Sequence, residues 1–131
     1  MIVTDDRAAR FVSERLDFAI APPFTCMGIE RDGHIVAGVI FHCFEGAAIH
    51  VTVAGSGWTP GFVRDVGEYV FGQLECCRIT VTTGRSDVAR IALRMGGKVE
   101  GCLRDQFGPG RDATIIGILR GEWKFGKFPL S

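Results

Sequence analysis

The sequence predicts a single α+β domain built on a mixed, mainly antiparallel sheet with flanking helices. Segments with the alternating pattern of strands are interrupted by stretches whose apolar residues recur at helical spacing. An Asp32-Gly33 pair between two strand-like runs is a strong signal for an antiparallel hairpin. Further along, one helix separates the strand at residues 47–54 from the strand at 78–82, which implies that these two strands are parallel.

Length and composition limit what the chain can be. With 131 residues, of which 47% are hydrophobic, residues 1–131 can form one domain with a real core. The net charge is zero and the basic residues are scattered, which argues against a stable grip on nucleic acid or on an anionic membrane. No segment has the pattern of a signal peptide or of a membrane span, so we expect neither secretion nor insertion.

The five cysteines are an odd number and lack C-x-x-C spacing. We expect them to be reduced packing residues of a cytoplasmic protein. The adjacent Cys76 and Cys77 offer a redox or metal device as an alternative. In a strand, however, they would point to opposite faces, which favours packing.

The first half of the chain is predicted to be a short strand, a helix and a three-stranded meander. Thr4 or Asp5 can cap the helix, and residues 21–24, with two prolines, are expected to end it. Breaks at Asp32-Gly33 and Glu45-Gly46 separate the strands of the meander. The expected strands are residues 1–3, 25–30, 34–44 and 47–54.

The second half alternates helices and strands. A glycine-rich turn over residues 55–61 opens a helix with Thr59 as its N-cap and Pro60 at its first position. The apolar stripe of this helix consists of Phe62, Val63, Val66, Val70 and Leu74. The remaining elements are a β-branched strand at 78–82, an amphipathic helix at 87–95 and two strands at 98–105 and 112–123.

The order of motifs from Gly84 to Phe125 carries a family resemblance. The helix ends at Gly96-Gly97, the next strand reads Glu100-Gly-x-Leu-Arg104, and the last strand ends in Glu122-Trp123. This order resembles the C-terminal half of the GCN5-related N-acetyltransferase (GNAT) superfamily. The likeness is greatest to its small phage and prophage members and to its acetyltransferases of ribosomal-protein type.

The resemblance implies that the sheet splays between its fourth and fifth strands and that acetyl-coenzyme A enters the gap. Splaying leaves backbone groups unpaired, and the amide-like pantetheine arm of the cofactor can bond to them. The backbone near Val51 and Val53 is then expected to hydrogen-bond the thioester carbonyl.

The turn before Pro60 is the candidate site for the pyrophosphate. A helix start presents unpaired N–H groups and the positive end of the helix dipole, and glycine allows close approach. The family motif Q/R-x-x-G-x-G/A aligns with Gly61 as its central glycine, while Trp58 and Val63 replace its first and last residues. An ordinary strand-to-helix connection is the alternative. The expected cofactor-binding residues of this turn are Gly57, Trp58, Thr59, Gly61, Phe62, Val63 and Arg64.

The helix after the fifth strand departs from the family pattern. Family members place an Asn at its start and a Tyr, as general acid, near its end; these positions fall on Arg85 and Ala92. Arg85 is a candidate phosphate ligand or, alternatively, a solvated arginine. Because Ala92 has no proton to donate, the leaving thiolate would be protonated by water or by another group.

His50 is the candidate general base for the attacking amine. It lies on the strand at 47–54 with Thr52 on the same face, and an imidazole titrates near neutral pH. A hydrogen-bonded structural histidine is the alternative, and His42 and Glu45 are weaker candidates for the base.

The sequence therefore predicts a cytoplasmic N-acetyltransferase that moves an acetyl group from acetyl-coenzyme A to an amine by direct attack. The first rival is an inactive GNAT-fold binding or virion-associated phage protein. The second is transfer to DNA bases, which the neutral charge opposes. Trp123, Phe125, Phe128 and Leu130 make the tail apolar, which predicts a homodimer whose contact comes from the last two strands and the tail from Trp123 to Phe128; packing of the tail against the same domain is the alternative.

Overall fold

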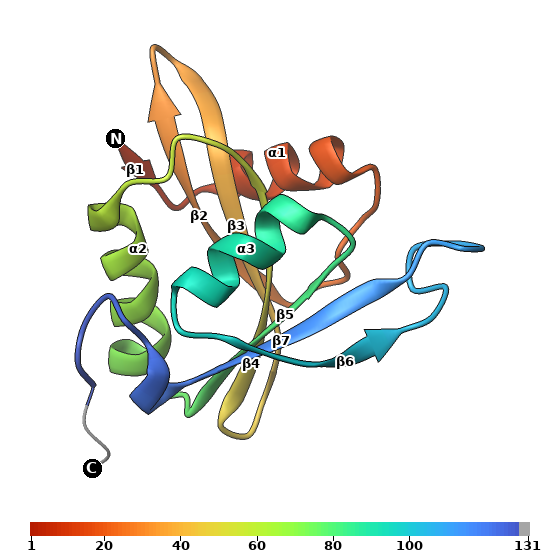
Figure 1. The fold of residues 1–131 in the computed structure, drawn as a ribbon. Coiled ribbons are helices and arrows are strands. Elements are labelled where there is room, and N and C mark those ends of the chain that lie inside the picture. Colours follow the sequence, from red (N-terminus) through yellow and green to blue (C-terminus); the bar gives the residue numbers. More distant parts are fainter. Residues whose placement is uncertain (129–131) are drawn as a thin grey trace.

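The computed structural model describes residues 1–128. Seven strands form one sheet in the order β1-β2-β3-β4-β5-β7-β6 (Figure 1). All neighbouring strands are antiparallel except β4 and β5, which confirms the predicted α+β class with a mixed, mainly antiparallel sheet. The strands are β1 (Ile2–Val3), β2 (Phe24–Arg31), β3 (His34–Glu45), β4 (Ala48–Gly55), β5 (Arg78–Thr83), β6 (Lys98–Leu103) and β7 (Ala113–Leu119). The α-helices are α1 (Asp6–Leu16), α2 (Pro60–Gly67) and α3 (Ser86–Arg94).

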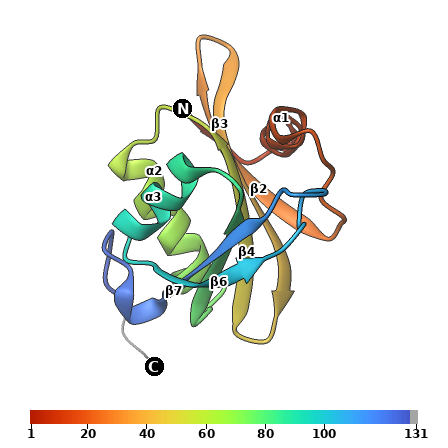
Figure 2. The same ribbon diagram turned by 45° about the vertical axis from the view of Figure 1, so that its right-hand side comes forward.

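The helices cover both faces of the sheet (Figure 2). Helix α1 packs on β2, β3 and β4, and the smaller apolar cluster lies beneath it. Helices α2 and α3 lie on the opposite face, over the larger core cluster. This arrangement gives β4 one face toward each helical layer.

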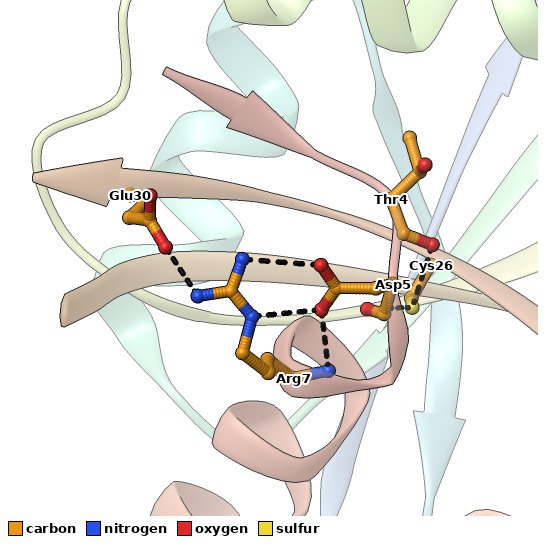
Figure 3. A network of polar contacts seen from close by, with 5 residues as sticks. All are labelled: Thr4, Asp5, Arg7, Cys26 and Glu30. Carbon is orange, nitrogen blue, oxygen red and sulfur yellow. Dashed lines mark hydrogen bonds and ion pairs between the residues drawn. The ribbon is translucent and has the colours of Figure 1, made fainter. Parts of the chain in front are cut away.

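The start of α1 is tied to β2 by polar contacts (Figure 3). Asp5 is the N-cap and accepts a hydrogen bond of 3.0 Å from the Arg7 N–H. The Arg7 guanidinium bonds to the Asp5 carboxylate and reaches Glu30 on β2, and its hydrogen bonds hold the pKa of Asp5 below its usual range. On the buried side, Cys26 Sγ donates to the carbonyls of Asp5 at 3.1 Å and Thr4 at 3.8 Å.

The parallel contact between β4 and β5 is short. Their register runs from Ala48 opposite Arg78 to Val51 opposite Val81 and then stops. Beyond this pair, β4 continues to Gly55 along β3, and β5 continues to Thr83 along β7. The two strands therefore separate on the side where each ends, which confirms the predicted splay. We call this opening the notch.

Three element boundaries differ from the prediction. Helix α1 ends at Leu16, with Asp17 in the left-handed conformation, well before the prolines. Helix α2 ends at Gly67 and continues as a π-helix over Glu68–Gln73. Strand β7 ends at Leu119, because the chain turns into a 3₁₀-helix, Arg120–Glu122, in which Glu122 Oε1 accepts from the Leu119 N–H at 3.0 Å.

The apolar tail packs within the domain as far as Phe128. Trp123 is only 5% exposed, and its ring lies 5.6 Å from that of Phe71 in the π-helix. Phe128 is 5.8 Å from the same ring, and Phe125 also packs against the larger cluster. Leu130 lies outside the described residues.

The cysteines at 26, 43, 76, 77 and 102 are all free thiols. Cys76 is buried and Cys77 is exposed, in the segment before β5. Within residues 1–128 no cluster of His, Cys, Asp or Glu has the arrangement of a metal site. No helix among the same residues has the length and apolar character needed to cross a membrane.

Candidate functional site

A cavity of about 440 Å³ lies at the notch. Its floor comes from Val51, Thr52 and Val53 on β4 and from Val81, Thr82 and Thr83 on β5. One wall comes from the end of α1 and the residues after it. The other comes from the start of α3 and from the β6–β7 loop, residues 104–112. The cavity thus occupies the gap that the separated strands leave.

A smaller cavity of about 60 Å³ lies among the sheet, α2 and α3. It is lined by apolar and aromatic side chains, including Trp58, Phe62 and Val63 from the α2 end. The residues that line both cavities are Val51, Val53, Val81 and Val88. Because these residues are shared, the two spaces adjoin at the notch, one on the α2 and α3 face and one toward α1.

The turn before α2 has a free backbone donor at Gly61. Thr59 accepts the Phe62 N–H through its side chain at 3.1 Å and the Val63 N–H through its carbonyl at 3.0 Å. Pro60 has no N–H, and within residues 1–128 the Gly61 N–H makes no hydrogen bond. A Cβ added at Gly61 would meet no atom nearer than Thr59 Oγ1 at 4.0 Å, so this backbone is accessible from outside.

The two replaced motif residues point away from that accessible backbone or pack beside it. Val63 is 6% exposed and belongs to the core, so its side chain does not cover the turn. Trp58 packs on Phe62, with ring centroids 5.5 Å apart. Although Val63 replaces the small residue of the family motif, its side chain therefore does not block an anion at Gly61.

The fold brings a cation to this turn that the sequence did not indicate. Arg31, at the end of β2, donates from Nη2 to the Gly57 carbonyl at 3.1 Å. Arg64 adds a second, exposed guanidinium on α2. Arg31 and Gly57 are far apart in the sequence, and no motif links them; only the β2–β3 hairpin places them together.

Arg85 lies at the notch rather than at the Gly61 turn. It occupies the N-cap position of α3, donates its N–H to Thr83 Oγ1 at 3.0 Å and lines the larger cavity. Its guanidinium binds the Asp87 carboxylate at 3.0 and 3.2 Å, which keeps the pKa of Asp87 below its ordinary value. Ala92 lines the smaller cavity and offers no proton.

His50 lies on the α1 side of β4, in register with His42 on β3 and Thr80 on β5. Its pKa is lowered by burial and then by the nearby charge of Arg78. The two imidazole rings are 5.8 Å apart, and burial and His50 lower the pKa of His42 as well. Both side chains are consequently neutral over a wider pH range than a free histidine.

Thr52 connects this histidine pair to the notch. Its hydroxyl is 2.8 Å from His42 Nε2 in a hydrogen bond, and it lines the larger cavity. Neither histidine lines that cavity. Glu45, the weaker candidate, is exposed at the far end of β3, opposite Ala48.

No protein-family model and no curated protein sequence matches this chain. Solved structures do match it. A ribosomal-protein-S5-alanine acetyltransferase from Vibrio fischeri is 17% identical, with 77% of this chain and 64% of that chain covered and a TM-score of 0.63. The chain thus spans somewhat less than two thirds of that protein.

Two other structures are covered almost completely. A spermidine N-acetyltransferase variant from Vibrio cholerae is 12% identical over 91% of this chain and 92% of its own, with a TM-score of 0.70. A GNAT-family acetyltransferase from Streptococcus pneumoniae is 13% identical over 91% and 98%, with a TM-score of 0.67. With the notch between β4 and β5 in the same domain, this protein has the fold of the GNAT acetyltransferase superfamily.

Proposed function

We propose that this protein is an N-acetyltransferase that transfers an acetyl group from acetyl-coenzyme A to an amine by direct attack. The observation that carries this proposal is the notch. After Val51, β4 has no partner on its β5 side, although a cavity lies there. An extended ligand with amide groups can satisfy such a strand edge. The acetyltransferases that share the fold support the same chemistry.

The residues present fit the two ends of this cofactor. The β4 edge near Val51 and Val53, which is unpaired beyond Val51, suits the pantetheine arm, and the free Gly61 N–H at the start of α2 suits the pyrophosphate. Gly57, Trp58, Thr59 and Arg64 would surround this second subsite, whereas the side chains of Phe62 and Val63 support it from the core. Arg31 and Arg64 supply the positive charge that Trp58 does not.

The protein's own contribution to the reaction is positioning and charge stabilisation. When bound, acetyl-coenzyme A supplies a thioester whose carbonyl carbon accepts the amine nitrogen as the bond to sulfur breaks. Backbone N–H groups of the free β4 edge near Val51 and Val53 would polarise that carbonyl. Since Ala92 cannot act as an acid, water or another group would protonate the departing thiolate.

The amine must lose a proton, and we assign this step to His50. Its lowered pKa leaves the imidazole neutral and able to accept a proton at neutral pH. A second route runs from the notch through the Thr52 hydroxyl to His42, because these groups are already hydrogen-bonded. Substitution of His50 distinguishes the two routes.

Calorimetric titration with acetyl-coenzyme A is the direct test. The proposal requires saturable binding, and coenzyme A should bind at the same site. An inactive GNAT-fold module, the rival reading, would bind neither compound. The accessible Gly61 backbone and the cavity at the notch both favour binding.

We also propose a cytoplasmic homodimer, since free thiols suit a reducing compartment. The contact surface we propose is the edge strand β6 with its neighbour β7. Val99, Leu103 and Leu119 are exposed there, whereas Trp123 is covered by its own chain. Light scattering on the full chain, and on a Val99→Lys variant, tests this: the wild type should have the mass of a dimer and the variant that of a monomer.

A further inference from the structure

The larger cavity at the notch has a cationic rim. Its lining includes three arginines, Arg15, Arg85 and Arg111, but a single carboxylate, that of Asp112. The protein as a whole has no net charge, so this concentration of guanidinium groups is local. A cavity whose lining has an excess of one sign of charge attracts ligands of the opposite sign.

Two carboxylates at this site already have hydrogen-bond partners. Asp112 Oδ1 accepts the backbone N–H of Asp105 at 2.9 Å and so holds the β6–β7 loop in shape. Asp87 neutralises Arg85. By contrast, Arg15 and Arg111 form no ion pair within residues 1–128; Arg15 lies over the Phe11 ring, 4.8 Å from its centroid. Two guanidinium groups are thus free to bind an anion.

These two arginines belong to segments that touch across the cavity. Phe18, which follows α1, and Phe107, in the β6–β7 loop, have ring centroids 5.6 Å apart. Arg15 lies one turn before Phe18, and Arg111 shares the loop with Phe107. Figure 2 shows the β6–β7 loop reaching the segment after α1. The aromatic contact therefore holds both arginines at one rim, above the floor of the notch.

We propose that the acceptor is an amine that also carries an anionic group, a carboxylate or a phosphate, and that Arg15 and Arg111 bind this group. This inference rests on the proposed acetyl transfer. The bound anion would direct the amine toward the notch, where its nitrogen forms the new bond to the carbonyl carbon. The carbon–sulfur bond then breaks with its electron pair on sulfur, and the ammonium proton goes to the base.

The same rim disfavours an acceptor that carries only positive charges. A polyamine would bring several ammonium groups beside unpaired guanidinium groups, and like charges repel in a partly desolvated cavity. This protein and the spermidine enzyme with which it shares a fold would then differ in acceptor class.

The test compares four probe amines by ligand-observed NMR titration at fixed ionic strength. The probes are 4-aminobutyrate, 2-aminoethyl phosphate, butylamine and spermidine. The protein variants are Arg15→Gln/Arg111→Gln and, as a matched control, Arg10→Gln/Arg104→Gln. The control removes the same charge from the same helix and loop, at exposed residues that do not line the cavity. Circular dichroism verifies that each variant is folded.

We expect at least one anionic amine to bind about tenfold more tightly than butylamine or spermidine, because hydrogen bonds to charged groups are the strong ones. The preferred anionic amine identifies the group as carboxylate or phosphate. The Arg15→Gln/Arg111→Gln variant should lose that preference and the control should keep it. Equal or tighter binding of butylamine or spermidine, absence of binding by both anionic amines, or an equal loss in the control would overturn the proposal.

A parallel titration with acetyl-coenzyme A separates this inference from the proposed function. Binding of the cofactor without a preference for anionic amines leaves the acetyltransferase proposal standing and removes this one. A preference for anionic amines without cofactor binding removes the acetyltransferase proposal and leaves the cavity as an anion-recognising site.

Discussion

His42 Nε2 and Thr52 Oγ1 are joined by a hydrogen bond of 2.8 Å between β3 and β4. Thr52 faces the notch cavity, whereas His42 lies behind it. Through this contact His42 is connected to the cavity, so His42 is an alternative to His50 as acceptor of the amine proton. Substitution of His50 distinguishes the two histidines.

Replacing His50 with Gln should lower turnover by about a hundredfold or more and flatten the acid limb of the pH–rate profile, because the proton acceptor is removed. Steady-state kinetics over pH measures both effects. His34→Gln, at an exposed histidine at the start of β3, is the control. An intact acid limb in the His50 variant would assign the proton to Thr52 and His42, to Glu45 or to a water chain.

The charge of Arg78 should set the pH at which activity falls. Arg78 lowers the pKa of His50, so Arg78→Gln should raise that pKa and move the acid limb to higher pH. Glu100 pairs with Arg78 at 2.6 Å, and Glu100→Gln leaves the arginine charge uncompensated. This second variant should shift the limb to lower pH. Shifts in the same direction would remove His50 as the titrating group.

Binding of coenzyme A should be sensitive to a negative charge at position 61 and insensitive to the addition of a methyl group there. Gly61→Glu should abolish binding of coenzyme A, because a carboxylate would face the pyrophosphate at the start of α2. Gly61→Ala should bind nearly as well as wild type, since a Cβ meets nothing closer than 4.0 Å. Calorimetry measures the affinity, and thermal melting should confirm that both variants fold. Unchanged affinity in the Glu variant would place the phosphates elsewhere.

Arg31 should contribute to cofactor affinity although it lies on a different element from the Gly61 turn. Losing one charge-assisted contact typically weakens binding about tenfold or more, so Arg31→Gln should raise the Kd for coenzyme A by that factor. Arg10→Gln, on the exposed side of α1, should leave the Kd unchanged. Dephospho-coenzyme A, which lacks the 3′-phosphate, reports which phosphate Arg31 contacts. Equal affinities of the two variants would limit Arg31 to holding the turn.

Gly67 is predicted to be necessary for the packing of Trp123 under α2. A Cβ at this position would overlap the indole Nε1, so the ring would have to shift. Gly67→Ala should therefore lower the free energy of unfolding by about 1–3 kcal/mol, the usual cost of overpacking. Gly121→Ala, where nothing lies within 4 Å, is the control. Equal urea midpoints would show that the ring moves without cost.

Local signals in the sequence determined most of the fold. Asp5 and Thr59 cap their helices as predicted, and the Asp32-Gly33 pair forms the hairpin turn, with both residues at positive φ. The strands needed only their alternating pattern and the breaks between them. These features depend on neighbours within a few residues, so they can be predicted from the sequence.

The sequence was least informative where distant segments meet. The change from α-helix to π-helix after Gly67 was not predicted, and the end of β7 was placed too late along the chain. The Trp123 ring packs on Gly67, and the chain turns at Arg120 before it reaches that position. Helical or strand spacing cannot encode such a contact, since β5, α3, β6 and β7 lie between Gly67 and Trp123 in the sequence.

The candidate site likewise has features that the sequence predicted and features that only the tertiary structure shows. The sequence by itself placed a helix-capping glycine turn after one strand and a histidine on that strand, because both follow from local spacing. Only the tertiary structure brought Arg31 to Gly57, joined His42 to Thr52 and gathered Arg15 and Arg111 at one cavity. The physical reason is that strand pairing and loop closure determine which side chains lie next to each other. These long-range contacts produce no periodic pattern in the sequence.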